Sequence, residues 1–132
     1  MNELIIVRGL PGSGKSTYAK DHFPNHLIYE PDHLFCDITG KYRFDAQLWN
    51  DAHEWVLKLV DFALARKEKV VVCDVFPTIK SLEEYQLLAD TYDIELTVFN
   101  MTKSHGSIHH VPITIIKEMC KKWEHIPNEI EI

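Results

Sequence analysis

The sequence predicts an α/β protein, a three-layer sandwich in which helices cover both faces of a mainly parallel sheet of about four or five strands. One reason is the order of the segments: β-prone runs alternate with stretches of helical periodicity, as in consecutive βαβ units. The other is that the first run, residues 4–7, is apolar at every position. A continuous apolar run of this kind is typical of a parallel strand buried on both faces.

Strands are predicted at residues 4–7, 27–29, 70–73 and 94–99. A short helix is expected over about residues 16–22, after a Gly-rich segment. A long amphipathic helix is expected over about residues 46–66, where apolar side chains recur at helical spacing: Leu48, Trp49, Ala52, Val56, Leu59, Val60 and Ala63. For Trp49 and Trp55, which occupy core-compatible positions of this helix, we favour packing over a ligand-binding role.

Two further helices are expected in the second half of the chain. Ser81 and Glu84 have the spacing of a capping box, which predicts a helix start at Ser81. Pro112 suits the first turn of a last helix, whose inward residues are expected to be Ile115, Ile116, Met119, Cys120 and Trp123. The polar, His-rich stretch between the last strand and this helix predicts a loop, and we expect a short lid at about residues 100–111.

Size and composition predict one domain over residues 1–132 and narrow the range of partners. The net charge of −6 argues against a broad nucleic-acid surface held by general electrostatics, although a local basic groove for one strand end remains compatible with it. The three cysteines are odd in number and widely spaced, which favours reduced thiols. No signal peptide and no apolar run of about 20 residues is visible, so we expect a cytoplasmic protein without membrane contact.

The strongest motif lies directly after the first strand. Gly9, Gly14, Lys15 and Ser16 have the Walker A spacing Gly-x-x-x-x-Gly-Lys-Ser, between an apolar strand and a helix. Glycines at these points let backbone N–H groups surround a phosphate, and the helix N-terminus adds a favourable dipole. We expect ATP and Mg²⁺ to bind here, with the following residues contacting the nucleotide: Gly9, Leu10, Pro11, Gly12, Ser13, Gly14, Lys15, Ser16 and Thr17. Lys15 is expected to reach the outer phosphates and Ser16 to join the metal shell.

Two aspartates follow predicted strands and are therefore expected at the same edge of the sheet as this loop. Asp74 closes the run at residues 70–73, as a Walker B acid does, and we expect it to orient Mg²⁺ or a metal-bound water. Asp32 follows the strand at residues 27–29, where a carboxylate can accept the proton of an acceptor hydroxyl. The alternatives are a strand-end turn for Asp74 and a helix N-cap for Asp32.

The motifs together resemble a known family. Residues 8–17, 29–32, 41–45 and 52–55 resemble, in this order, small phage and bacterial P-loop kinase-like ATP-binding proteins related to the kinase domain of phage polynucleotide 5′-kinase. A kinase-like domain of a eukaryotic ubiquitin-ligase-binding protein is similar as well, and residues 107–123 resemble the family's lid and closing helix. The resemblance implies an adenylate-kinase-like P-loop NTPase fold, Mg²⁺ and ATP, and transfer to a hydroxyl, often a nucleic-acid 5′-OH. It also implies that Lys15 and Asp32 are catalytic, the latter as general base.

The lid departs from the family, whose members usually carry arginines there. No Arg occurs between residues 100 and 123, and a transition-state arginine is worth about 10³–10⁵ in rate. Either a lysine substitutes as a point charge, or Arg8 or Arg43 supplies the charge, or transfer is slow. The candidate substrate or lid residues are Arg43, Lys103, His105, His109, Lys121 and Lys122. We favour phosphate contact over metal binding for the histidines.

Three functions remain open from the sequence. The first is an active kinase acting on a polynucleotide 5′-OH, a nucleoside, a nucleotide or a modified base. The second is an ATP-binding module with little turnover, such as a pseudokinase or nucleotide switch. The third, a P-loop hydrolase or motor, is disfavoured because no residue that positions a water is evident.

Overall fold

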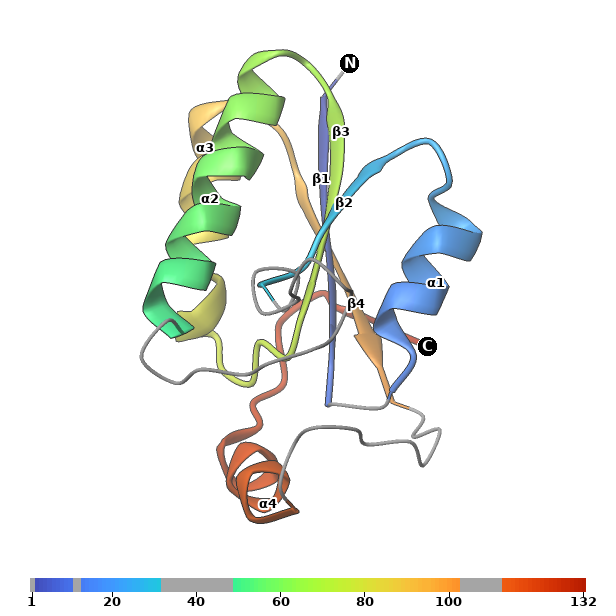
Figure 1. Cartoon of the computed structure of the whole chain (residues 1–132), viewed down its shortest axis with the longest axis vertical. Helices are drawn as coiled ribbons and strands as arrows, with labels where there is room; N and C mark the ends of the chain where they lie inside the picture. Colours follow the sequence, from blue (N-terminus) through green and yellow to red (C-terminus); the bar gives the residue numbers. More distant parts are fainter. Residues whose placement is uncertain (1, 11–12, 32–48, 103–112) are drawn as a thin grey trace, which may run out of the picture.

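A computed structural model of the protein describes residues 2–10, 13–31, 49–102 and 113–132 (Figure 1). The described chain forms a five-stranded sheet in the order β2-β3-β1-β4-β5, and every neighbouring pair is parallel. The strands are Glu3–Gly9 (β1), Leu27–Tyr29 (β2), Lys69–Asp74 (β3), Leu96–Met101 (β4) and Ile130–Glu131 (β5). The predicted α/β fold with a parallel sheet is confirmed.

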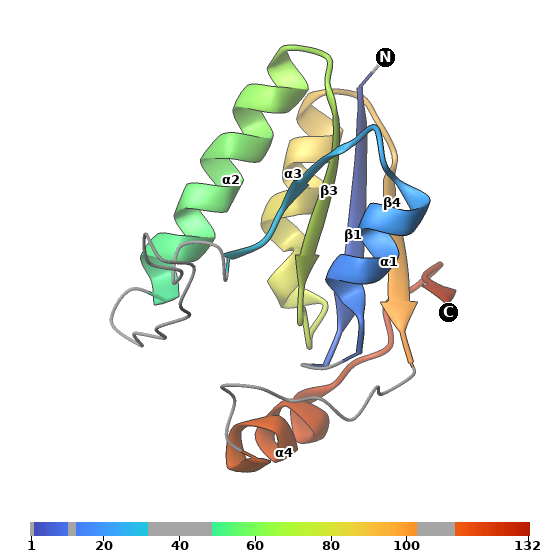
Figure 2. The same ribbon diagram turned by 45° about the vertical axis from the view of Figure 1, so that its right-hand side comes forward.

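The central strands are the most apolar because both of their faces are covered. In β1 and β3, Leu4, Ile6, Val70 and Val72 belong to one core cluster, which also contains side chains of two helices. These helices are α2 (Trp49–Ala65) and α3 (Glu83–Thr91), and they lie together on one face of the sheet (Figures 1 and 2). The alternating residues of β1 and β3 pack on the other face against α1 (Lys15–His22).

The remaining helix, α4 (Ile113–Lys122), lies beyond the carboxyl end of the sheet, as Figure 2 shows. A short 3-10 helix, η3 (Lys80–Leu82), leads into α3. No helix in the described parts of the chain is long and apolar enough to cross a membrane.

The core face of α2 is largely as the periodicity predicts, with one exception. Ala52, Val56, Val60 and Ala63 are buried, whereas Trp55 is 38% exposed, so its position on α2 is not the core position that the sequence suggested. Trp55 directly precedes Val56, and one residue turns the helix by about 100°, so its ring lies at the margin of the buried stripe. The side chain of Trp49 lies outside the described part.

The predicted capping box at Ser81 and Glu84 is not formed. The α-helix begins at Glu83, and its N-cap residue Leu82 makes no side-chain cap hydrogen bond. The side chain that caps this region is Thr78, whose Oγ1 accepts from the Ser81 N–H at 3.2 Å. The 3-10 turn therefore moves the start of the helical segment upstream of the predicted position.

The C-terminal part differs from expectation in two respects. Cys120 is exposed, not inward, because it falls on the outer side of α4. The chain after α4 returns to the sheet and adds β5 next to β4, a strand that the sequence pattern did not predict. Strand β4 itself extends through Met101, so that Asn100 and Met101, placed in the expected lid, belong to the sheet.

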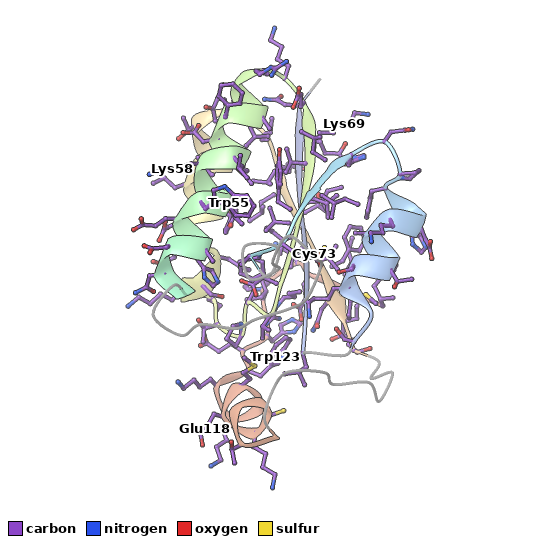
Figure 3. All side chains as sticks on the ribbon, in the orientation of Figure 1. Trp55, Lys58, Lys69, Cys73, Glu118 and Trp123 are labelled. Carbon is purple, nitrogen blue, oxygen red and sulfur yellow. The ribbon has the colours of Figure 1, made fainter. Side chains whose placement is uncertain are left out.

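One buried arginine holds this returning segment in place. Arg8 of β1 is fully buried and donates from Nε to the carbonyl of Phe76 at 2.9 Å. Its Nη1 pairs with Glu129 at 2.7 Å, and its Nη2 donates to the carbonyl of Glu124 at 3.0 Å. The guanidinium also lies 3.9 Å from the centre of the Trp123 ring, which Figure 3 places between α4 and the end of the sheet.

Candidate functional site: the phosphate loop and its carboxylates

The loop between β1 and α1 is shaped by two glycines. A Cβ at Gly9 would lie 2.4 Å from the Oγ of Ser13 and 3.0 Å from the Cβ of Met101, so the chain passes there only without a side chain. Gly14 has φ 85°, a left-handed conformation that glycine adopts without strain. Both glycines of the Walker A spacing are thus required by the backbone, independently of any ligand.

The Lys15 side chain folds back over the loop that precedes it. Its Nζ donates to the carbonyl of Gly9 at 2.9 Å and to that of Leu10 at 3.2 Å. These contacts hold the ammonium at the mouth of the loop, beside the N-terminus of α1. An ammonium and a helix N-terminus at one place favour an anion strongly.

Ser13 carries an orphaned polar atom inside this loop. Its side chain is buried, and its Oγ has no hydrogen-bond partner among the described residues. Its backbone N–H donates to the carbonyl of Leu10 at 3.1 Å, which closes the turn. A buried unpaired hydroxyl costs about 1–3 kcal/mol and therefore indicates a missing partner. The residues present fit a bound phosphate group.

Ser16, in the first turn of α1, is joined to the end of β2. Its Oγ donates to Oε1 of Glu30, the residue that directly follows β2. The serine expected to bind Mg²⁺ is therefore in contact with a carboxylate, and hydroxyl and carboxylate oxygens are ligands that this ion accepts. The donor set fits a magnesium site.

Asp74, at the end of β3, has different partners. Its Oδ2 lies 2.8 Å from Nε2 of His53 on α2, and its Oδ1 accepts the N–H of Val75 at 2.8 Å. In the register of β3 with β1, Asp74 stands opposite Arg8. Arg8 directly precedes Gly9, the first residue of the Walker A spacing. The predicted metal residue is thus at the correct edge of the sheet, with its carboxylate bound by α2.

The pKa of the Cys73 thiol depends on its burial and on the charged groups near it. Burial, chiefly, raises the pKa of this thiol to about 12, and the negative charges of Glu30 and Asp74 raise it further. The positive charge of Lys15 acts in the opposite direction. Cys73 also contacts the backbone of α1, with its Sγ 3.9 Å from the carbonyl of Lys15. Glu30, Asp74 and Lys15 are therefore all near enough to this thiol for their charges to change its pKa.

Several predicted site residues cannot be placed. The stretches outside the described residues include Pro11, Gly12, Asp32, Arg43, Lys103, His105 and His109. Thr17 is exposed on α1, and Lys121 and Lys122 are exposed on the last turn of α4, where Lys121 Nζ lies 3.4 Å from Oε1 of Glu118.

Arg8, one alternative source of the transition-state charge, is engaged elsewhere. Its ion pair with Glu129 and its bonds to the carbonyls of Phe76 and Glu124 occupy the guanidinium. Burial lowers its pKa, and the hydrogen bond to Glu129 raises it in opposition. This arginine joins the C-terminal segment to β1.

Two residues of the site were not singled out from the sequence. Glu30 lies between the strand at residues 27–29 and Asp32, and His53 lies in the segment 52–55, so both fall in segments that carried the family resemblance. A polar residue at the carboxyl end of a parallel strand is the signal that marks Glu30. For His53, an inward polar residue on an amphipathic helix is the corresponding signal.

A third group of acidic and imidazole ligands lies at the β5 edge. One ligand atom each of His125, Glu129 and Glu131 falls within 4.8 Å of the others. Glu129 is already paired with Arg8, and its Oε1 accepts from Asn100 at 3.1 Å. Only Glu129 of this group belongs to the buried ion pair with Arg8; His125, whose Nδ1 lies 3.0 Å from Oε1 of Glu129, and Glu131 are exposed.

Comparison with known proteins agrees with this geometry. The family model described as an AAA domain, AAA_33, matches residues 4–110. Human NEDD4-binding protein 2 is 36% identical over 74 residues, which are 54% of this chain and 4% of that protein.

Solved structures share the fold. A chain of the Pnkp1/Rnl/Hen1 RNA repair complex has a TM-score of 0.63 at 19% identity, covering 96% of this chain and 40% of its own length. A gluconokinase from Sinorhizobium meliloti 1021 has a TM-score of 0.64 at 18% identity, covering 98% of this chain and 81% of its own. This chain thus spans a small part of the human relative and less than half of the RNA-repair chain. With a family match over most of its length, the chain belongs to the AAA domain family AAA_33 and has its P-loop kinase-like fold.

Proposed function

We propose that this protein is an ATP-dependent phosphotransferase that moves the γ-phosphate to a hydroxyl. The observation that carries the proposal is the loop after β1. There the Lys15 ammonium and the Ser16 hydroxyl gather at a helix N-terminus, together with a Ser13 hydroxyl that has no hydrogen-bond partner in the described parts of the chain. This arrangement suits a polyphosphate and supports phosphoryl transfer, in which positioning and electrostatics supply most of the catalysis.

Each residue has a distinct role in the proposed reaction. The backbone of residues 9–17 holds the phosphates, and Lys15 neutralises charge on the outer ones. Ser16 and Asp74 hold Mg²⁺ or its water. When bound, this ion neutralises charge that develops on the phosphate oxygens. Asp32, just after the described end of β2, accepts the acceptor's proton.

In the proposed reaction, the acceptor hydroxyl displaces ADP from the γ-phosphorus in one step. The acceptor oxygen forms a bond to the γ-phosphorus while the bond from that phosphorus to the β–γ bridging oxygen breaks. The electron pair of the broken bond leaves with ADP, and the proton of the acceptor hydroxyl passes to the Asp32 carboxylate. The part of the expected lid that follows β4 closes over the acceptor in this proposal, within a single domain of residues 1–132.

We propose a polynucleotide 5′-OH, or a related nucleoside or nucleotide hydroxyl, as the acceptor. An RNA repair complex is among the structures with this fold, and so is a gluconokinase, which extends the range of acceptors to be tested. The net charge of −6 favours recognition of one strand end over a long nucleic-acid surface. Arg43, between Tyr42 and Phe44, supplies the phosphate clamp and base stacking in this proposal.

A specific observation favours a second candidate, an ATP-binding module with little turnover. No Arg occurs between residues 100 and 123, and Arg8 is bound to Glu129 in the buried network. Unless Arg43 or a lid lysine supplies the transition-state charge, ATP binding persists while transfer is slow.

The test is incubation with γ-labelled ATP, Mg²⁺ and a panel of acceptors: 5′-OH oligonucleotides, nucleosides, nucleotides, modified-base DNA and gluconate. Label in one class identifies the acceptor, and label in none supports the binding module. Asp32→Asn should keep ATP binding and slow transfer by about 10²–10⁴ if Asp32 is the general base. Asp21→Asn, at an exposed position of α1, is the matched control and should transfer at the wild-type rate.

A further inference from the structure

The contact between Ser16 and Glu30 brings a carboxylate to the predicted metal serine from an unassigned position. In the register of β2 with β3, Tyr29 stands opposite Val72, so Glu30 follows at the level of Cys73. On the other side of β3, Arg8 stands opposite Asp74, one residue before the loop. The parallel register therefore brings Glu30 to the same edge as the phosphate loop.

The chemistry of the contact fixes the direction of the serine lone pairs. A hydroxyl has one proton to donate and two lone pairs to offer. Because the Ser16 Oγ donates its proton to Glu30, its lone pairs face away from that carboxylate. A ligand whose proton is held by a neighbouring acceptor is oriented toward its metal, and such acceptors commonly decide metal affinity.

Asp74, the carboxylate expected from the sequence to serve this site, has its described contacts with other groups. One of its oxygens is 2.8 Å from His53 and the other accepts the Val75 N–H. Within the described part of the chain, the carboxylate that contacts the Ser16 hydroxyl is that of Glu30. The two acids therefore contact different helices: Asp74 contacts His53 of α2, and Glu30 contacts Ser16 of α1.

The electrostatics also indicate a cation at this point. Glu30 follows β2 and Asp74 ends the neighbouring strand β3, and the Lys15 Nζ lies on the carbonyls of Gly9 and Leu10 at the same edge of the sheet. A triphosphate bound beside Lys15 would bring further negative charge close to the carboxylates of Glu30 and Asp74. A divalent cation between the phosphates and these carboxylates relieves the repulsion that one lysine cannot balance.

We propose that Glu30 is the positioning residue of the magnesium site: by accepting the Ser16 proton it directs the serine oxygen to Mg²⁺ bound with ATP. The inference rests on the proposed function, since it needs a nucleotide in the loop. It adds Glu30 to the two residues, Ser16 and Asp74, that the sequence assigned to the metal.

Binding of ATPγS, measured by calorimetry in EDTA and across a Mg²⁺ titration, tests the assignment without turnover. Glu30→Gln removes the charge at similar size, and it should raise the Mg²⁺ concentration for half-maximal tightening of nucleotide binding by about 10–100-fold. In EDTA the same variant should bind ATPγS as tightly as wild type or more tightly, because a negative charge near the phosphates is gone. A merely structural defect would weaken binding in both conditions.

Three controls sharpen the test. Glu95→Gln, at an exposed position before β4, should match wild type in both conditions. Ser16→Ala combined with Glu30→Gln should raise the Mg²⁺ requirement no further than Ser16→Ala alone, because one residue acts through the other. Glu30→Asp keeps the charge on a shorter side chain and should fall between wild type and Glu30→Gln, which provides a second variant if Glu30→Gln folds poorly.

The outcomes separate this inference from the proposed function. A wild-type Mg²⁺ requirement in Glu30→Gln, or losses that add in the double variant, would overturn the role of Glu30 while leaving the ATP site intact. A wild-type protein that takes up no ATPγS, with or without Mg²⁺, would overturn the proposed function and this inference with it.

Discussion

Lys15 folds over the loop that it is expected to serve, with its Nζ on the carbonyls of Gly9 and Leu10. A bound polyphosphate would exchange these neutral acceptors for charged oxygens, and hydrogen bonds to charged groups contribute about 1.5–3 kcal/mol. Lys15→Ala should therefore weaken ATP binding by at least roughly tenfold to a hundredfold, as measured by calorimetry. Lys58→Ala, at an exposed position of α2, should bind ATP as wild type does, and equal losses in the two variants would contradict the role of Lys15.

The buried thiol of Cys73 is expected to react slowly with alkylating reagents in the native protein. Burial raises the pKa of its thiol to about 12, so that at pH 8 only about one thiol in 10⁴ is the reactive thiolate. Because the pKa is raised, the thiolate fraction grows about tenfold per pH unit and stays small until pH approaches that value. The exposed Cys120 should be alkylated by iodoacetamide at pH 8 much faster than Cys73, as measured by site-resolved mass spectrometry. Equal rates in the native protein would show that the Cys73 thiol is accessible and ionised.

At the scale of elements, the start of α3 depends on a residue outside the helix. The Thr78 Oγ1 accepts the Ser81 N–H, and the Ser81 Oγ donates to the Thr78 carbonyl. Thr78→Ala should lower the free energy of unfolding by about 1 kcal/mol, the usual cost of losing such a cap. Glu84→Gln, which removes an exposed carboxylate without a capping bond, should change it by less than about 0.5 kcal/mol. Urea unfolding of both variants measures the difference, and a larger effect at Glu84 would restore the capping-box interpretation.

Some elements could be predicted from sequence because their pattern follows from their environment. Strands β1 and β3 are covered on both faces, so nearly every residue is apolar, and the inner face of α2 recurs at helical spacing. Strand β5 carries no such signal. Its Ile130 and Glu131 are exposed, and they pair with β4 because the tail is held by Arg8. Two residues fixed by a distant ion pair have no local pattern to detect.

In the candidate site, too, some features could be predicted from the sequence and others could not. The phosphate loop is predictable because the glycine, lysine and serine spacing is dictated by local backbone geometry. The contact of Ser16 with Glu30, and that of Asp74 with His53, depend on the register of three strands and the placement of α2. Register between segments far apart in the chain is not encoded in either segment alone. The sequence therefore indicated that Asp74 lies at this edge, but neither the presence of Glu30 there nor the groups that the two acids contact.

At the scale of the whole molecule, Arg8 connects the first strand to the last segment of the chain. Its side chain and that of Glu129 are 0% and 1% exposed, and they lie 2.7 Å apart. Carbonyls of Phe76 and Glu124 accept its other donors. The network thus joins the β1 strand, which leads into the phosphate loop, to the chain after β3 and to the tail that follows α4.

Loss of Arg8 should therefore destabilise the whole fold. Arg8→Met leaves Glu129 as a buried charge without its partner, and breaking a buried pair in this way costs about 3–5 kcal/mol. Arg66→Ala, which removes an exposed pair with Glu68 at 3.8 Å, is the matched control and should cost less than about 1 kcal/mol. Urea unfolding followed by circular dichroism gives both values, and similar small losses would show that Arg8 does not hold the tail.

The double variant Arg8→Met with Glu129→Gln separates the ion pair from the packing around it. The Glu129→Gln change keeps an acceptor for the Asn100 amide, which now donates to Glu129 at 3.1 Å, while removing the charge that Arg8→Met leaves buried. The double variant should lose less stability than the sum of the single losses, by about 1–3 kcal/mol, because the second change removes the cost created by the first. Full recovery is not expected, since the carbonyls of Phe76 and Glu124 lose their donor. Strictly additive losses would mean that the tail is held by β5 pairing and by the packing of Trp123, with the charges contributing independently.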